Sequence, residues 1–140
     1  MYYMDTSIVV ALLTREPAAE RVSAWLREQT PGSLHLSGWT VTEFSSALSL
    51  KLRTDQIGTE QKATALAAFN RLVSRSLVVL PVASQDFHAA ARLCDRSELS
   101  LRAADSLHIA IAVRTGLPIA TLDKVMAAAC TAIAHPAQFI

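Results

Sequence analysis

The chain has 140 residues, of which 51% are hydrophobic and 18% are charged, and its formal net charge at pH 7 is +1. This length predicts one compact domain, 1–140, with its own core, and is short for two. A net charge near zero gives no sign of a protein that attracts nucleic acid by overall positive charge. The high apolar fraction leads us to expect a surface covered by another chain, such as a homodimer interface.

Nothing in the chain predicts a membrane segment or a secretory signal. The longest apolar runs, such as 125–134, are short, rich in alanine and unable to span a bilayer. The N-terminus has no basic segment and reaches Asp5 almost at once. Cys94 and Cys130 lie in helix-like segments without metal-ligand spacing, so we expect buried thiols and a cytoplasmic protein.

Strands alternate with helices along the chain. In order, hydrophobic periodicity and turn residues predict strand 2–4, helix 8–13, helix 18–26, strand 34–36, helix 39–53, helix 60–75, strand 77–82, a helix from 84 that ends before 97, helix 102–115, strand 118–121, helix 124–130 and a last edge strand 132–134. Thr59 and Ser84 are the expected N-caps of their helices.

Several of these strands are continuously apolar, above all Leu77–Val82, which we expect to be buried. Such strands, alternating with helices, indicate a parallel sheet that is covered on both faces. In open sheets of this kind, ligands bind at the carboxyl ends of the strands. The acidic residues near those ends are therefore the first candidates for a site.

Asp5 stands directly after the first strand, in Met4-Asp5-Thr6-Ser7. An aspartate there can simply cap the following helix. Because Thr6 and Ser7 could cap it equally well, we favour a site role for the carboxylate.

Glu43 has two interpretations that do not exclude each other. Thr40-Val41-Thr42-Glu43 matches the capping box, in which the glutamate reaches back to the backbone amide of the cap. Alternatively, Glu43 follows the strand 34–36 closely enough for its carboxylate to point across the top of the sheet.

Asp105 lies within 102–111, a stretch that is apolar nearly all round and so predicts a central, buried helix. An aspartate is costly to bury there unless it is paired or bound to a metal. A salt bridge to Arg102 would satisfy it in part, but we favour a site role. For His108, one turn later, packing with a hydrogen bond is the more usual role than metal ligation.

Asp123 follows the strand 118–121, and an N-cap and a ligand are equally good interpretations of it. Thr121 could share either task. The other carboxylates considered are interpreted as solvated or capping residues: Asp55, Asp86, Asp95 and Glu98.

Four carboxylates gathered without as many cations cannot all stay ionised unless a hard cation such as Mg²⁺ or Mn²⁺ is present. The chain has no cysteine or histidine pattern typical of zinc. Sites made of acids alone suit phosphoryl chemistry, in which the metal shields phosphate charge and activates water.

In order and spacing, four motifs resemble the PIN-domain ribonucleases, and more closely the VapC toxins of type II toxin–antitoxin pairs. They are Met4–Ser7, Thr42–Phe44, Leu101–His108 and Thr121–Asp123. The first and third are fairly specific, whereas the second and fourth are persuasive only together with them. The resemblance covers the whole chain and implies a three-layer α/β/α sandwich around a mostly parallel sheet.

The resemblance also implies site residues and partners. Asp5, Glu43, Asp105 and Asp123 match the acidic metal-binding positions, and Thr6 matches the hydroxyl beside the first acid. The implied activity is Mg²⁺- or Mn²⁺-dependent endonucleolytic cleavage of RNA by a homodimeric toxin that a cognate antitoxin inhibits.

Other functions agree less well with the residues. A phosphatase of the haloacid-dehalogenase type wants an aspartate two residues after Asp5, where this chain has Ser7. A response-regulator receiver wants paired acids at the end of the first strand. The serious alternative is a PIN-like scaffold or RNA-binding protein that holds RNA without cutting it.

Overall fold

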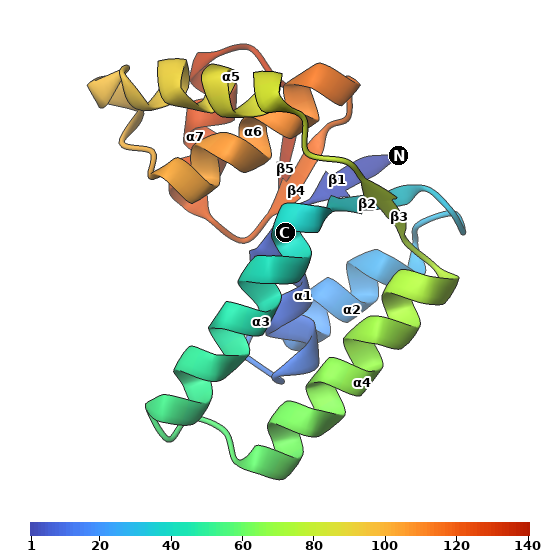
Figure 1. Cartoon of the computed structure of the whole chain (residues 1–140). Helices are drawn as coiled ribbons and strands as arrows, with labels where there is room; N and C mark the ends of the chain where they lie inside the picture. Colours follow the sequence, from blue (N-terminus) through green and yellow to red (C-terminus); the bar gives the residue numbers. More distant parts are fainter.

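A five-stranded parallel sheet forms the centre of the molecule in the computed structural model, which describes residues 1–140 (Figure 1). The strands are ordered β3-β2-β1-β4-β5, and all four neighbouring pairs are parallel. Their bounds are β1 Tyr2–Met4, β2 Leu34–Ser37, β3 Val78–Leu80, β4 Ile119–Thr121 and β5 Ala137–Phe139. The predicted α/β fold with a central parallel sheet is thereby confirmed.

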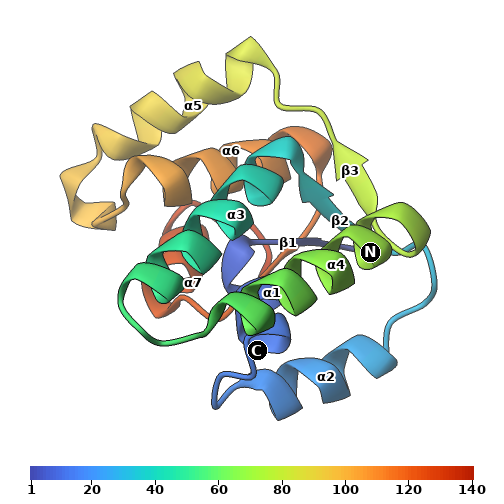
Figure 2. The ribbon, with the colours of Figure 1, turned by 60° about the horizontal axis from the view of Figure 1, so that its bottom comes forward.

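Helices cover both faces of the sheet, which makes three layers. In Figure 1, four helices lie below the sheet: α1 Thr6–Leu13, α2 Ala19–Arg27, α3 Gly38–Arg53 and α4 Thr59–Arg75. Above it lie α5 Ser84–Cys94, α6 Ala103–Thr115 and α7 Lys124–Ala132, with a short 3₁₀ turn, Ser97–Leu99, between α5 and α6. The helices α3 and α4 run side by side as a hairpin (Figure 2).

Two hydrophobic cores follow from the alternation of side chains along the strands. Met4 and Leu36 belong to the core under α1–α4, where the rings of Phe44 and Phe69 stack with centroids 4.2 Å apart. Tyr3 and Ile119 belong to the core under α5–α7. Every residue of α6 from Ser106 to Ala112 is buried, as the predicted central helix requires.

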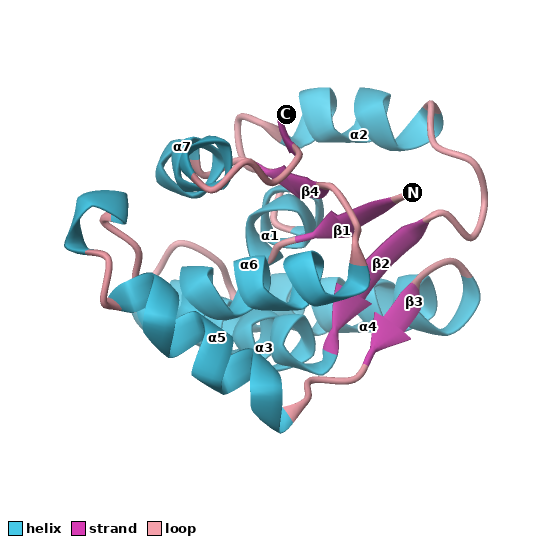
Figure 3. Cartoon of the chain, turned by 90° about the horizontal axis from the view of Figure 1, so that it is seen from above, coloured by secondary structure: helices cyan, strands magenta, loops and turns pink.

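The strand order places a switch point between β1 and β4. From β1 the chain moves outward through β2 to β3, then returns to the other side of β1 as β4 and continues to β5 (Figure 3). At such a reversal the connections leave the sheet in opposite directions, which opens a crevice at the carboxyl ends of the two strands. Asp5 follows β1, and Asp123 follows β4 closely.

Two strand predictions are wrong. The run predicted as a buried strand, 77–82, shortens to β3 at the edge of the sheet, where Val78 and Val79 are 41% and 42% exposed. The last strand is not 132–134: α7 continues to Ala132, Ala134 takes φ +57°, and β5 begins at Ala137. Burial and pairing at an edge depend on which strands are neighbours, which local composition does not encode.

The helix caps also differ from prediction. Ser37, and not Thr40, caps α3; Thr40 is the partner whose side chain completes the capping box. Gly58 caps α4 in place of Thr59, and Ala83 caps α5 in place of Ser84. In the last case Asp86 accepts a hydrogen bond of 2.8 Å from the Ala83 amide.

The structure adds detail to the predictions for Asp86 and Cys130 and contradicts the prediction for Cys94. Asp86 is a capping residue as expected, but it is only 1% exposed and forms an ion pair with Arg114, whose Nε lies 2.6 Å from its Oδ1. Burial raises the pKa of Cys130 to about 11. Cys94, predicted to be buried, is exposed, and its Sγ donates to the Ser106 hydroxyl. No helix is long and apolar enough to cross a membrane.

Candidate active site

Asp5 is the acid most tightly held by the fold. It caps α1, so the role that the sequence left open is real: Oδ1 accepts from the Ser7 amide at 3.1 Å and from the Ser7 hydroxyl at 2.5 Å. Oδ2 accepts from the hydroxyl of Thr121, on the neighbouring strand β4, at 2.7 Å. Asp5 is 3% exposed, and burial raises its pKa although hydroxyl donors and the charge of His108 oppose the rise.

Glu43 is not part of a capping box. It lies in the second turn of α3, and its Oε2 is 2.6 Å from Nε2 of His108. The hydroxyl of Thr6 donates to the same oxygen. Burial raises the pKa of Glu43, but the hydrogen bond and the charge offered by His108 outweigh burial, so the net shift is downward.

His108 connects Glu43 to a buried chain of polar groups. Its Nδ1 lies 2.7 Å from the Tyr3 hydroxyl, which in turn lies 2.9 Å from Oγ of Ser37. Burial is the main cause that raises the pKa of Tyr3, so its hydroxyl keeps its proton at neutral pH. His108 thus uses both ring nitrogens in hydrogen bonds, Nε2 with Glu43 and Nδ1 with Tyr3. The expectation that His108 is packed and hydrogen-bonded is confirmed.

Asp105 lies in the first turn of α6 and is half-buried. Its Oδ2 accepts from the Arg102 amide at 3.2 Å, and the salt bridge to the Arg102 guanidinium considered above does not form. Burial raises the pKa of Asp105, and the negative charges of Asp123 and Glu43 raise it further. The two like charges come from other elements, since Asp123 is the N-cap of α7 and Glu43 is on α3.

Asp123 is the N-cap of α7, as one of its two interpretations predicts. Oδ1 accepts from the amides of Val125 and Met126, at 2.7 and 3.2 Å. Its own amide donates to Thr121, whose hydroxyl donates in turn to Asp5. From the sequence, Thr121 was expected only to share the capping or ligand role of Asp123, and Ser7 only to be able to cap a helix. In the structure, these two hydroxyl residues together connect Asp5 to Asp123.

The oxygen donors are of the kind that Mg²⁺ and Mn²⁺ take. Glu43, Asp105 and Asp123 each use one carboxylate oxygen in hydrogen bonds within the protein and keep the other available. No lysine or arginine forms an ion pair with any of the four acids. No three acidic, histidine or cysteine side chains are positioned to hold one ion together, so shared ligation by Asp5, Glu43 and Asp105 stays a prediction.

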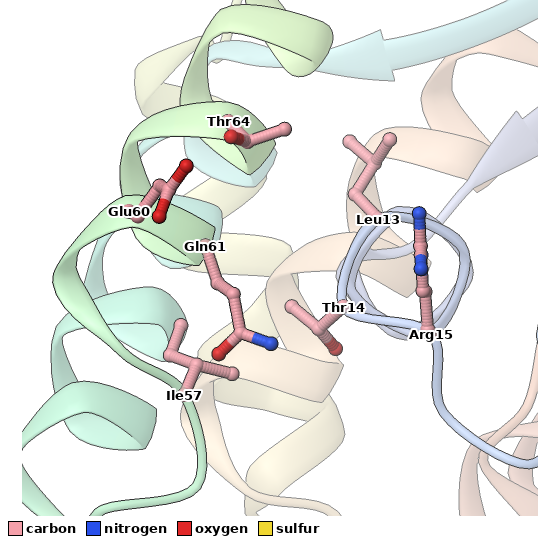
Figure 4. Close-up of a pocket in the computed structure, with 7 residues that line it drawn as sticks. All are labelled: Leu13, Thr14, Arg15, Ile57, Glu60, Gln61 and Thr64. Atoms are coloured by element: carbon pink, nitrogen blue, oxygen red, sulfur yellow. The ribbon is translucent and has the colours of Figure 1, made fainter.

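A separate hollow between the end of α1 and the start of α4 has no comparable chemistry. Its volume is ≈ 240 Å³, below the about 300 Å³ at which ligand pockets usually begin. Glu60 is the only carboxylate in its lining, so several acids cannot meet there (Figure 4). The seven lining residues are Leu13, Thr14, Arg15, Ile57, Glu60, Gln61 and Thr64.

The parallel α/β/α sandwich, with an aspartate after each of the two strands at its switch point, belongs to the open α/β class, in which ligands bind at the carboxyl ends of the strands. Comparison with protein families identifies the family within this class, because the family model for the PIN domain matches residues 2–131. The chain belongs to the PIN-domain family. A comparison with curated protein sequences finds no match.

Solved structures of toxin–antitoxin proteins share the fold. VapC20 of Mycobacterium tuberculosis, a sarcin–ricin loop cleaving toxin, is 20% identical with a TM-score of 0.73, covering 92% of this chain and 95% of its own. FitAcB of Neisseria gonorrhoeae is 24% identical (TM-score 0.69; 98% and 96% covered). VapBC2 of Rickettsia felis, bound to a promoter DNA fragment, is 16% identical (TM-score 0.65; 99% and 98% covered). At these identities the likeness is one of fold.

Proposed function

We propose that this protein is a metal-dependent endoribonuclease and the toxin of a toxin–antitoxin pair. The observation that carries the proposal is a PIN fold in which Asp5 and Asp123 follow the two strands at the switch point, while no lysine or arginine is paired with any of the four candidate acids, Asp5, Glu43, Asp105 and Asp123. Uncompensated carboxylates are costly to keep in a protein, and a bound cation would compensate them.

The four acids would hold Mg²⁺ or Mn²⁺, and Thr6 would orient Glu43. When bound, the metal shields the charge of the phosphodiester and lowers the pKa of the attacking water. The contribution of the chain is to fix the donors: Ser7 and Thr121 hold both oxygens of Asp5, while His108 and Thr6 hold one oxygen of Glu43. Asp123, whose carboxylate is held by the hydrogen bond with which it caps α7, would be the peripheral metal ligand.

Two partners besides RNA belong to the proposal. A groove of ≈ 480 Å³ between α1, α2 and α4 is lined mainly by apolar side chains, and an antitoxin segment would bury its own apolar side chains there. Large apolar side chains that stay exposed, such as Leu50 and Val113, support a homodimer. Structures with the same fold include toxin–antitoxin complexes, which makes a protein partner a natural expectation. We place the protein in the cytoplasm, where RNA is accessible to it.

The alternative is a protein that holds RNA without cutting it. The contact between Glu43 and His108 supports this alternative, because Glu43 then has a partner within the protein in place of a metal. Cleavage assays separate the two functions.

The test incubates purified protein with end-labelled RNA in Mg²⁺, in Mn²⁺ and in EDTA. We expect cleavage with either metal and none in EDTA. Because a ligand that binds only the folded state stabilises it, Mg²⁺ at 100 times its dissociation constant should add about 2.7 kcal/mol to the free energy of unfolding. RNA binding without cleavage, in a protein that neither metal stabilises, would support the alternative.

A further inference from the structure

Phe139 is an exposed aromatic ring between two cations. It lies on β5, is 43% exposed, and has the guanidinium carbon of Arg21 at 5.7 Å and Nζ of Lys124 at 6.0 Å from its ring centroid. The cations come from different elements, α2 and α7. Neither forms a salt bridge with a carboxylate, so both charges are available to an anion.

The ring and the acids occupy the same edge of the sheet. Phe139 is the β-sheet partner of Thr121, whose hydroxyl donates to Asp5. Lys124 follows Asp123 directly and shares with it the lining of an open hollow of ≈ 530 Å³, which Thr6 and Ser7 also border. This volume lies within the about 300–1,000 Å³ typical of ligand pockets. The hollow therefore reaches from Asp123, and from Thr6 and Ser7 next to Asp5, to Lys124, whose Nζ lies 6.0 Å from the centroid of the Phe139 ring.

The charges in this hollow favour one direction for a bound polyanion. Glu16, which also lines it, is paired with Lys51 at 2.7 Å, so its charge is compensated. Asp123 is linked to Asp5 through Thr121, whereas the ammonium of Lys124 lies over the Phe139 ring. A phosphate of the RNA on the Phe139 side of Asp123 would therefore contact Lys124 and Arg21. Lysine binds a phosphate as a point charge, and arginine binds it through two parallel hydrogen bonds.

We propose that Phe139, Arg21 and Lys124 form a subsite for an unpaired nucleotide of the RNA that flanks the cleaved phosphodiester. The base stacks on the Phe139 ring, and the adjoining phosphate binds the two cations once they swing off the ring. A base paired in a helix cannot reach a ring in this way, so the subsite selects single-stranded RNA. This inference rests on the proposed function, which identifies the ligand as RNA. It adds the place on the surface where the RNA continues beyond the cleaved phosphodiester.

A binding assay without divalent metal tests the subsite independently of cleavage. The probe is a fluorescently labelled single-stranded RNA of about 12 nucleotides, within the site sizes of single-strand binders, alone or annealed to its complement. Fluorescence anisotropy in EDTA gives the dissociation constants. We expect Phe139→Leu, which keeps an apolar side chain but removes the ring, to weaken single-strand binding roughly 5- to 100-fold and to leave duplex binding nearly unchanged. Phe139→Trp should bind as the parent does.

The matched control is Phe87→Leu, because Phe87 is another exposed phenylalanine, 55% exposed, on α5. It should bind RNA as the parent does. Lys124→Gln and Arg21→Gln should each lower the slope of log affinity against log salt by about 0.7, the value for one phosphate contact in a single strand. Arg27→Gln, in the last turn of α2, should leave the slope unchanged.

The outcomes separate this inference from the proposed function. A protein that binds single-stranded RNA through Phe139 but does not cut it would overturn the function and keep the subsite. A protein that cuts RNA, with Phe139→Leu showing the affinity and the KM of the parent, would overturn the subsite and keep the function. If Phe139→Leu instead changes the sedimentation coefficient and leaves RNA affinity unchanged, the ring belongs to a protein interface and the subsite is refuted.

Discussion

Asp5 and Asp86 are almost equally buried, at 3% and 1% exposure, and both accept from a backbone amide at the start of a helix that follows a strand. Asp5 is the N-cap of α1, and Asp86, in the first turn of α5, accepts from the amide of the N-cap Ala83. Their surroundings differ. Asp86 accepts from Nε and Nη2 of Arg114, at 2.6 and 3.0 Å, and thereby fastens α5 to α6. Asp5 has only hydroxyls and an amide as direct partners, and its pKa is raised because burial outweighs them.

This difference teaches where to look for a function. A buried carboxylate with an arginine is already compensated, and the pair holds two helices together. A buried carboxylate whose direct partners are all neutral donors has no cation of the chain in contact with it, and such a group is a candidate for binding a metal. Burial alone does not distinguish the two aspartates; the partner does.

The largest effect is expected from Asp5→Asn. The asparagine keeps the size of the side chain and can still accept from Ser7, but it lacks the charge that would hold a metal. RNA cleavage should fall by more than about 100-fold, since the metal supplies several kcal/mol of transition-state stabilisation. Asp86→Asn is the matched control and should keep its cleavage rate wherever it stays folded, as circular dichroism would verify. Equal losses of activity in both variants would erase the proposed contrast.

Next in size is the loss of stability in Arg114→Leu. It leaves Asp86 with the Ala83 amide as its remaining partner in a site that is 1% exposed. Urea unfolding should show a loss of about 3 kcal/mol, the low end of the cost of breaking a buried pair, because Arg114 is itself partly exposed. Arg92→Leu, on the exposed side of α5, should change stability by less than about 0.5 kcal/mol. A loss as small as that in Arg114→Leu would show that the pair is not a structural fastening.

A smaller loss is expected from Tyr3→Phe. The variant removes the hydroxyl between Ser37 and His108 and leaves Nδ1 of His108 without its partner. The free energy of unfolding should fall by about 1–2 kcal/mol. Tyr2→Phe is the control on the same strand, because the Tyr2 hydroxyl makes no hydrogen bond within the protein. Equal stability of the two variants would mean that the chain from Ser37 to Glu43 does not support the site.

The smallest effect is a pH-dependent gain in Asp105→Asn. The pKa of Asp105 is raised in the fold above 3.8, so the folded state binds a proton that the unfolded state has released, and the parent loses stability as pH rises through this range. Asparagine has no such loss. The Tm of the variant should therefore exceed that of the parent by more near pH 7 than near pH 3. A variant with the same Tm difference at both pH values would contradict the crowding of charges around Asp105, and the exposed Asp95→Asn is the control.

Sequence reasoning found the acids but not what holds them. Asp5, Glu43, Asp105 and Asp123 were identified from their positions after strands and within an apolar helix, and the fold sets Asp5 and Asp123 after the two strands at the switch point. That the four acids form one metal site stays a prediction. The roles of Tyr3, Ser37 and Thr121 were not visible, because their contacts join residues 34 to 116 positions apart. One of the two interpretations of Glu43 placed it in a capping box with Thr40, but Ser37 and Thr40 form that box, since several hydroxyls within four residues satisfy the same local pattern.

Periodicity and the cost of burying charge were enough to predict the alternation of strands and helices, the central helix α6 and the candidate acids. The strand order, in contrast, is known only from the folded structure. That order exposes Val78 and Val79 at an edge, pairs Ala137–Phe139 with β4, and gives Asp86 an arginine but Asp5 only neutral donors. The physical reason is that neighbours distant in sequence set the burial and the compensation of each side chain, and local pattern carries no information about them.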